Sequence, residues 1–218
     1  MNNFPSQDEV VNSVLTGITT AQSNYSLWIA HQLHLSYAPS KFLSTHIAQE
    51  LAKMKYLPEI FIDAKISDIL KSSLNCKDSY TSYMAENNIS QDVMSLTLDE
   101  RFEHQNDNDC ISRVIITVKN GVRNAQPEYK DAINVLCKLL QRDNKEDSSL
   151  DYGLFAFYLD VSNSARKKSK KRLEEIINTF DDIVSKYTNL QSTFKRGDIN
   201  QLENIGEWCV GCYIIEPK

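Results

Sequence analysis

A lysine stands at the end of a strongly apolar, β-branched stretch of this chain. The stretch runs Ile111-Ser-Arg-Val-Ile-Ile-Thr-Val-Lys119 and is followed by Asn120-Gly121. Its composition predicts a buried central strand, and the Asn-Gly pair predicts a turn at its end. Because side chains alternate along a strand, Thr117 and Lys119 are expected on the same face. This would place an ammonium group beside a polar residue at the edge of a rigid element, although an ordinary solvated strand end looks the same.

A dense cluster of positive charge lies near the C-terminal end. It falls in the first turns of a helix expected from about residue 164 to 187, where the helix dipole disfavours cations. A bound phosphate backbone would offset that cost, and a simple solvated helix face is the alternative. No aromatic residue is interleaved with the cluster, so the sequence does not predict single-strand binding. Its members are Arg166, Lys167, Lys168, Lys170, Lys171 and Arg172.

Cysteines and histidines offer weaker signals. Cys209-Val-Gly-Cys212 has CxxC spacing, but no second pair is near it and its strand is apolar, so packing is favoured over zinc binding. His31 and His34 are three residues apart on an expected helix, and His46 lies on the next. They could gather a metal or be partly buried. The chain has no GxGxxG, P-loop, GxSxG or HExxH motif, and its 6 glycines leave little material for a nucleotide-cradling loop.

Length and composition predict a single domain over 1–218. With 218 residues, 41% of them hydrophobic and 24% charged, the chain can bury a globular core. A net charge of -5 argues against a protein that coats nucleic acid, but it allows a local basic patch. No apolar run approaches the ~20 residues of a membrane span. The N-terminus does not have the composition of a signal peptide, and five scattered cysteines fit reduced thiols, so we expect a cytoplasmic protein.

The periodicity of the apolar residues predicts an α/β fold, with a mixed central β-sheet flanked by helices. A helical N-terminal segment, 1–55, precedes an α/β core, 56–218. Ser6 and Glu9 predict a capping box, Ser40 a second helix start, and Asp63 or Ser67 the cap of a third. Expected helices cover 6–35 (continuous or broken near 22–24), 40–53, 66–74, 127–140 and 164–187. Expected strands cover 58–63, 93–103, 111–119, 152–161 and 208–215, the second and third forming a hairpin and the third and fourth a parallel crossover.

This order of elements, with a strand ending in lysine before a crossover helix, resembles the PD-(D/E)xK nuclease superfamily, which includes many restriction endonucleases. The resemblance covers about residues 40 to 180. Relatives found near bacterial defence genes carry similar patterns, and the matching segments here are Arg101-Phe-Glu103, Ser112-Arg-Val-Ile-Ile-Thr-Val-Lys-Asn120 and Gly153-Leu-Phe-Ala-Phe-Tyr158.

The resemblance implies phosphodiester cleavage with Mg²⁺ or Mn²⁺ held by acidic side chains and a lysine near the attacking water. It places metal ligands at Asp63 and Glu103 and the catalytic set at Glu103, Thr117 and Lys119. Thr117 stands where the family has an acidic residue, so we expect an activity that is weakened or lost.

The expected function is a DNA-associated protein of a bacterial restriction or anti-phage defence system, and a metal-dependent endonuclease if it is active. DNA would bind the basic cluster, and a protein partner or a homodimer is also expected. The alternative is a non-enzymatic protein–protein interaction module on the same scaffold.

Overall fold

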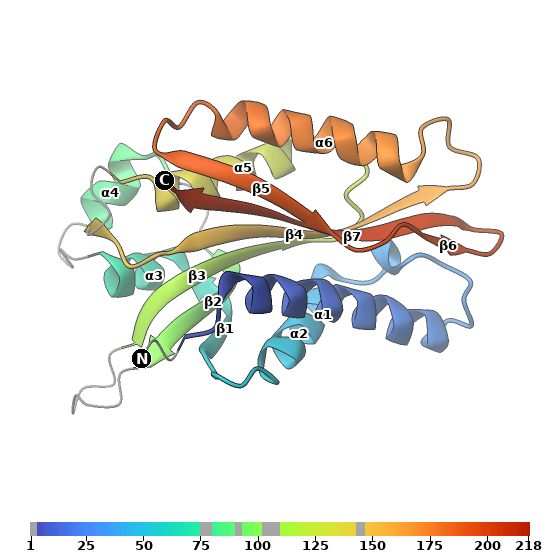
Figure 1. Cartoon of the computed structure of the whole chain (residues 1–218), viewed down its shortest axis with the longest axis horizontal. Coiled ribbons are helices and arrows are strands. Elements are labelled where there is room, and N and C mark those ends of the chain that lie inside the picture. The colour runs from blue at the N-terminus through green and yellow to red at the C-terminus, as the bar shows by residue number, and fades with distance from the viewer. Residues whose placement is uncertain (1–3, 75–79, 90–92, 102–109, 143–146) are drawn as a thin grey trace.

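The computed structural model describes residues 4–74, 80–89, 93–101, 110–142 and 147–218, and it has one mixed seven-stranded sheet (Figure 1). The order across the sheet is β1-β2-β3-β4-β7-β5, and β6 also pairs with β7. Strands β3 and β4 run parallel, and the other pairs formed by the described strands are antiparallel. The expected mixed sheet is thereby confirmed. The strands are β1 (Glu59–Lys65), β2 (Val93–Arg101), β3 (Cys110–Lys119), β4 (Tyr152–Ser162), β5 (Leu190–Arg196), β6 (Asn200–Leu202) and β7 (Gly206–Pro217).

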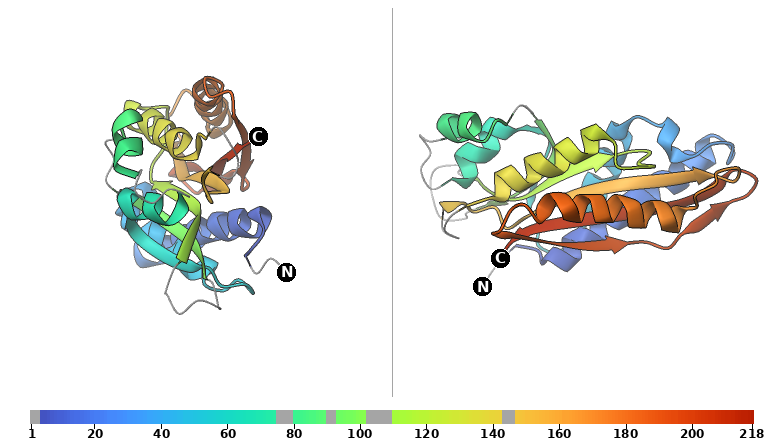
Figure 2. Two further views of the ribbon diagram at one scale, coloured as in Figure 1. Left: turned by 90° about the vertical axis from the view of Figure 1, so that its left-hand side faces the viewer. Right: turned by 90° about the horizontal axis from the view of Figure 1, so that it is seen from above.

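Helices cover both faces of the sheet. Helices α1 and α2 lie on one face, and α5 and α6 lie on the other (Figure 2). Each face has its own core: Val10, Ile47 and Ile116 belong to one cluster, Leu136 and Phe180 to the other. The expected helical N-terminal layer is therefore packed directly on the sheet. The helical elements are α1 (Gln7–Trp28), the 3-10 turn η1 (Leu35–Tyr37), α2 (Ser40–Leu51), α3 (Ile66–Ser73), α4 (Tyr80–Glu86), α5 (Pro127–Leu140) and α6 (Ser169–Val184).

Strand β4 is buried from Tyr152 to Val161, because helices cover it on both sides. Phe155 and Phe157 join the core under α5 and α6, and Tyr158 joins the core under α1 and α2. The parallel pairing with β3 sets Lys119 opposite Phe157. The helix α5 makes the crossover between the two strands, as its apolar face predicted.

The N-terminal helix is unbroken but shorter than expected. The capping box is confirmed, since Glu9 Oε2 accepts from the Ser6 backbone N–H at 2.9 Å and Ser6 Oγ accepts from the Glu9 N–H. The helix ends at Trp28 because Ala30 and His31 turn the chain with φ of 50° and 60°. No glycine or proline lies at that turn, so the sequence did not predict the end of the helix.

The next two helices begin at the predicted positions, Ser40 and Ile66, but their predicted capping residues are wrong. Pro39, not Ser40, is the N-cap of α2. Lys65 is the N-cap of α3 with no side-chain hydrogen bond, so neither Asp63 nor Ser67 caps it.

The C-terminal third holds more sheet than predicted. Helix α6 begins at Ser169, not near 164, and strands β5 and β6 follow it. β5 was not predicted because its alternation is weak: Leu190 is buried, but the positions after it are only partly buried or exposed.

Among the described helices, none combines the length and the apolar character that a membrane crossing requires.

Candidate functional site

Thr117 is turned into the protein and not toward an open site. It lies on β3 with 2% of its surface exposed. Its hydroxyl donates to the sulfur of Met94, 3.1 Å away, and Met94 belongs to the core under α5. A buried hydroxyl with a partner of this kind contributes to packing, and it offers no oxygen to a solvent-accessible cation.

Lys119 ends β3, as the sequence predicted, and is partly exposed. Its ammonium group forms no hydrogen bond or ion pair with another residue of the described ranges. The chain then turns sharply: the side-chain amide of Asn120 donates to the carbonyl oxygens of Leu35 and Ala38, at 2.9 and 2.8 Å. Gly121 has φ of +71°, a conformation that favours glycine. The Asn-Gly pair therefore ends the strand and fastens it to the segment around η1.

Asp63, the described member of the expected metal-ligand pair, does not join Thr117 and Lys119. Asp63, on the edge strand β1, forms an ion pair with Lys41 of α2. Its carboxylate therefore points to the face of the sheet that α1 and α2 cover, whereas Thr117 faces the core on the other side. Glu103 lies outside the described residues. The last described residue of β2, Arg101, pairs with Cys110 at the start of β3, whereas Lys119 is at its end.

Nothing within the described ranges gathers three histidine, cysteine, aspartate or glutamate side chains that could hold a metal ion. Of the expected set, Thr117 is buried and Asp63 is paired with Lys41, so these two residues do not fit the Mg²⁺ or Mn²⁺ site that the resemblance implies.

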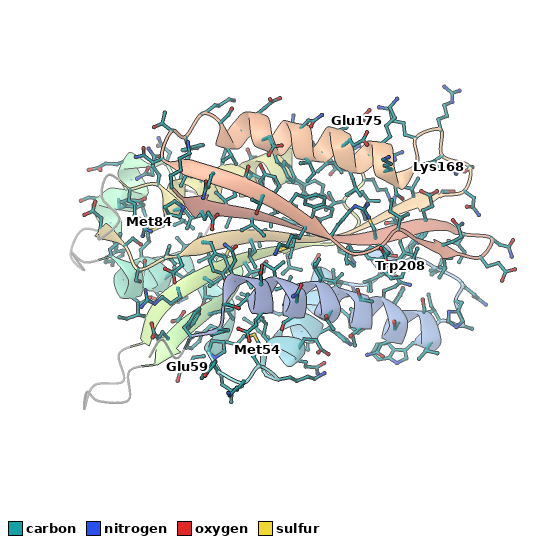
Figure 3. All side chains as sticks on the ribbon, in the orientation of Figure 1. Met54, Glu59, Met84, Lys168, Glu175 and Trp208 are labelled. Atoms are coloured by element: carbon teal, nitrogen blue, oxygen red, sulfur yellow. The ribbon has the colours of Figure 1, made fainter. Side chains whose placement is uncertain are left out.

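The basic cluster, which we call the basic segment (166–172), lies where α6 begins (Figure 3). Its first three cations precede the helix, with Lys168 as the N-cap, and do not fall within it as expected. Lys167 pairs with Glu175 at 2.7 Å. The N–H of Ser169 donates to the carboxylate of Glu207 at 2.9 Å, which satisfies one free donor of the helix start.

Neither set of candidate zinc ligands comes together. Cys209 lies in the core under α6 and Cys212 in the core under α1, so their thiols are on opposite faces of β7. Burial raises the pKa of both to about 12. His46 bonds to Phe42 O and Asn24, whereas His34 lies in a separate pocket near Tyr158.

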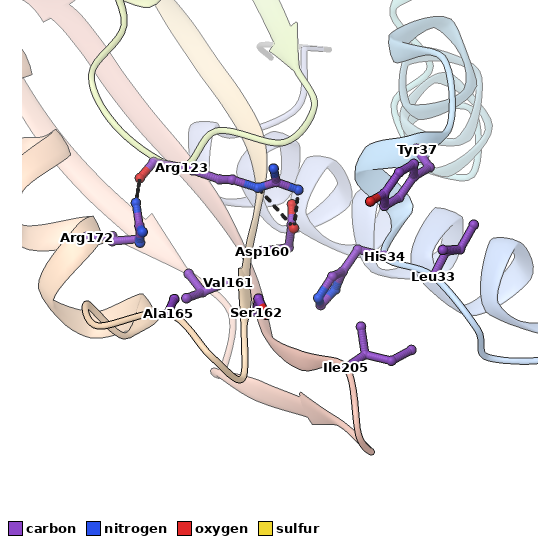
Figure 4. Close-up of a pocket in the computed structure, with 10 residues that line it drawn as sticks. All are labelled: Leu33, His34, Tyr37, Arg123, Asp160, Val161, Ser162, Ala165, Arg172 and Ile205. Atoms are coloured by element: carbon purple, nitrogen blue, oxygen red, sulfur yellow. Dashed lines mark hydrogen bonds and ion pairs between the residues drawn. The ribbon is translucent and has the colours of Figure 1, made fainter.

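That pocket, here called the Asp160 pocket, is a cavity of about 330 Å³. It lies beyond the ends of β3 and β4, at the carboxyl ends of the parallel strands, where open α/β sheets commonly bind ligands (Figure 4). Five segments contribute to it: η1 with the residues before it, the turn after β3, the end of β4, the start of α6 and the β6–β7 turn. Its lining residues are Leu33, His34, Tyr37, Arg123, Asp160, Val161, Ser162, Ala165, Arg172 and Ile205.

An ion pair forms the charged centre of the Asp160 pocket. Asp160 is 1% exposed, and its Oδ2 accepts from Nε and Nη2 of Arg123 at 3.1 and 2.6 Å. This bonding raises the pKa of Arg123. Arg172 donates from Nη1 to the carbonyl oxygen of Arg123 at 2.8 Å, which brings the basic segment to the pocket. Two guanidinium groups therefore share one side of the cavity.

His34 is the second buried polar group of the pocket. It is 5% exposed, and its Nδ1 lies 3.5 Å from the hydroxyl of Tyr158. Its Nε2 and the Oδ1 of Asp160 have no hydrogen-bond partner among the described residues. Burial lowers the pKa of His34, and the charge of nearby Asp160 opposes that effect. Burial therefore favours the neutral imidazole.

Sequence reasoning missed the Asp160 pocket, although one signal was present. An aspartate within a continuous apolar strand is rarely fully buried unless it is paired, so Asp160 implied a cationic partner. Sequence could not show which cation would pair with it, because Arg123 lies 37 positions away.

A comparison with known proteins finds no matching family model, no matching curated protein and no matching solved structure, so the chain is assigned to no family.

Proposed function

We propose that this protein binds nucleic acid through the phosphate backbone, on a PD-(D/E)xK-like scaffold whose metal-dependent phosphodiesterase activity is weakened or lost. The observation that carries the proposal is the basic segment. It presents six cations within seven residues, five of them exposed and Arg172 partly exposed, in a chain whose net charge is -5. Concentrated positive charge of this kind is the usual electrostatic footprint of a phosphate-binding surface.

The charges of α6 run against its dipole. Lys170 and Lys171 lie in the first turn, where the helix presents partial positive charge, and Asp181 and Asp182 lie in the last. Each such placement costs about 0.3–1 kcal/mol at an exposed site. Asp181 has a structural role, since it accepts from Tyr213 at 2.5 Å and from Ser192 at 3.1 Å.

Lys170 and Lys171 have no comparable role. Both are exposed, and neither ammonium group forms a hydrogen bond or a close ion pair in the described parts of the chain, although the charge of Lys171 helps to lower the pKa of Glu175. A phosphate backbone would offset their unfavourable position, because each contact releases a condensed counterion.

The scaffold supports the second half of the proposal. Lys119 ends β3 just before the crossover to the parallel strand β4, which is the arrangement on which the resemblance depends. Two of the side chains that should surround it have other partners: the Thr117 hydroxyl bonds to Met94, and the Asp63 carboxylate pairs with Lys41. Lys119 thus has no described carboxylate beside it to share a metal ion.

The binding test compares two charge-reversed double variants. Fluorescence anisotropy with a labelled duplex, repeated over a range of salt, measures affinity and its salt dependence. In Lys170→Glu/Lys171→Glu we expect weaker binding and a slope of log K against log salt that is smaller by about 2, since each phosphate contact contributes about 0.9. Glutamate in the first turn suits the dipole, so the helix should remain folded.

The matched control is Lys65→Glu/Lys186→Glu, which changes the net charge equally at exposed positions elsewhere. It should keep the wild-type slope. An equal loss in both variants, or no binding by the wild type, contradicts the proposal and favours the protein–protein interaction module.

Catalysis is tested separately. Calorimetric titration of Mn²⁺ and a plasmid-cleavage assay should give little or no heat of binding and little or no cleavage with the wild type. Efficient cleavage that requires Mn²⁺ and disappears in Lys119→Ala would contradict a weakened or lost activity.

A further inference from the structure

The Asp160 pocket and the basic segment form one continuous surface, because Arg172 belongs to both. Arg172 is held in place by two backbone acceptors, the carbonyl oxygens of Lys167 at 3.2 Å and of Arg123 at 2.8 Å. A strand whose phosphates follow the basic segment would therefore meet the mouth of the pocket. The question is which part of the strand the pocket would accept.

The size of the pocket limits the answer. At about 330 Å³ it is at the lower end of the range of about 300–1,000 Å³ found for small-molecule sites. A cavity of this size suits a group no larger than one nucleotide, and it is too small for a length of duplex.

The charge of the pocket further limits the kind of group that it can bind. Arg123 and Arg172 contribute two positive charges, Asp160 contributes one negative charge, and burial keeps His34 neutral, so the pocket is cationic overall. Nη1 of Arg123 and Nη2 of Arg172 make no hydrogen bond within the described parts of the chain. These free guanidinium donors favour an anionic group such as a phosphate.

The opposite wall is apolar and aromatic. Tyr37 is 67% exposed and Leu33 is 39% exposed, although both lie against a pocket in the folded protein. Figure 4 shows Tyr37 across the cavity from Arg172, with Ile205 at the lower edge. An exposed tyrosine ring is a surface on which a nucleobase stacks without regard to its sequence. Below it, His34 supplies a buried imidazole nitrogen that has no partner in the described structure.

We propose that the Asp160 pocket holds one unpaired nucleotide of a nucleic-acid strand, with its base against Tyr37 and its phosphate at Arg123 and Arg172. This inference rests on the proposed function, since the basic segment would bring the strand to the pocket. The sequence does not reveal this site, because its parts are far apart in the chain. The tyrosine on which the base would stack lies in the N-terminal layer, and the two arginines lie more than eighty positions later.

The test uses a blunt duplex and the same duplex with a short single-stranded tail. The wild type should bind the tailed duplex about tenfold more tightly, the effect expected of one base–aromatic stack. Tyr37→Ala should remove that preference and leave the affinity for the blunt duplex unchanged. Tyr37→Phe should keep it, because the ring is retained. Tyr37 is largely exposed, so a thermal melt should show both variants folded.

Tyr56→Ala is the matched control, since Tyr56 is another exposed tyrosine, 41% accessible, that does not line the Asp160 pocket. It should retain the preference for the tail. The inference is overturned if the wild type shows no preference, or if Tyr37→Ala keeps it or weakens binding to both duplexes equally. Salt-dependent binding without a preference would leave the proposed function standing and remove only this inference, whereas no binding to either duplex would remove both.

Discussion

Arg123 binds the buried carboxylate of Asp160 through a single oxygen, leaving the other oxygen without a partner among the described residues. The two groups are unequal in burial: Asp160 is 1% exposed, and the Arg123 side chain is 49% exposed. The arginine can therefore return to water if its partner is lost, but the carboxylate cannot. The stability of this corner of the molecule depends on the cation more than on the anion.

Replacing Arg123 with alanine should destabilise the fold by about 3 kcal/mol, because it leaves a buried charge without compensation. Urea denaturation measures the change in the free energy of unfolding. Arg172→Ala is the control, and it should cost less, about 1–2 kcal/mol, because its two hydrogen bonds go to backbone carbonyl oxygens and its loss leaves no buried charge. Equal losses in the two variants would show that Asp160 is not held by Arg123 alone.

His34 should make stability depend on pH. Burial lowers its pKa below the ordinary 6.5, so the unfolded chain takes up a proton at a higher pH than the folded chain does. The contribution is fully present above 6.5, and it is lost as pH falls from there toward the lower pKa of the folded state. Denaturation curves at about pH 7 and about pH 5 measure this loss, which should be smaller in His34→Gln. An unchanged pH dependence in that variant would mean that other groups cause it.

Placing at position 117 the acidic residue that the PD-(D/E)xK resemblance implies should destabilise this protein. Thr117→Glu places a carboxylate in a position that is 2% exposed beside Met94, and we expect a loss of about 3 kcal/mol or more. Thr117→Val, which has nearly the same shape and loses only a weak hydrogen bond to sulfur, should cost less than about 1.5 kcal/mol. Chemical denaturation provides both values. A folded Thr117→Glu variant that gains a calorimetric signal with Mn²⁺ would instead reveal a latent metal site.

Gly17 sets how closely α1 approaches α2. A Cβ atom there would lie 2.6 Å from Cα and 2.9 Å from the backbone nitrogen of Ile47, and neither atom can rotate away. Gly17→Ala should therefore destabilise the protein by about 2 kcal/mol, despite the gain of about 1 kcal/mol in helix propensity. Thr16→Ala, one residue earlier and exposed, should be neutral or slightly stabilising. Thermal melts of the two variants separate close packing from propensity, and equal melting temperatures would contradict the role given to Gly17.

The predicted parts of the fold were those with strong local signals. The β-branched run before Lys119 and the apolar run from Tyr152 specified strands that are covered on both faces, and Pro127 marked the start of α5. The end of α1 was not predictable, because Ala30 and His31 adopt positive φ without a residue type that favours it. β5 was not predicted because it is an edge strand with many polar residues and only one face toward the core. Its apolar and polar residues therefore do not alternate clearly.

The site was predicted less well, for a physical reason. Sequence placed Lys119 at the end of its strand correctly, but it could not show that the Thr117 hydroxyl turns to Met94 or that Asp63 pairs with Lys41. Whether Lys119 is catalytic stays a prediction, as does any role of Glu103. The Asp160 pocket depends on long-range contacts that only the folded chain reveals.

Strand β7 lies between β4 and β5 although it follows both of them in the chain. Its pairing with β4 extends from Gly153↔Ile215 to Ser162↔Gly206, so the partners are tens of residues apart. Until β7 arrives, β5 has no strand to join, and the edge of β4 presents open hydrogen-bonding groups. Closing such distant pairings is slow, and the open edge can meanwhile pair with another chain. During synthesis, the unpaired β4 edge is therefore a point at which this protein is vulnerable to aggregation.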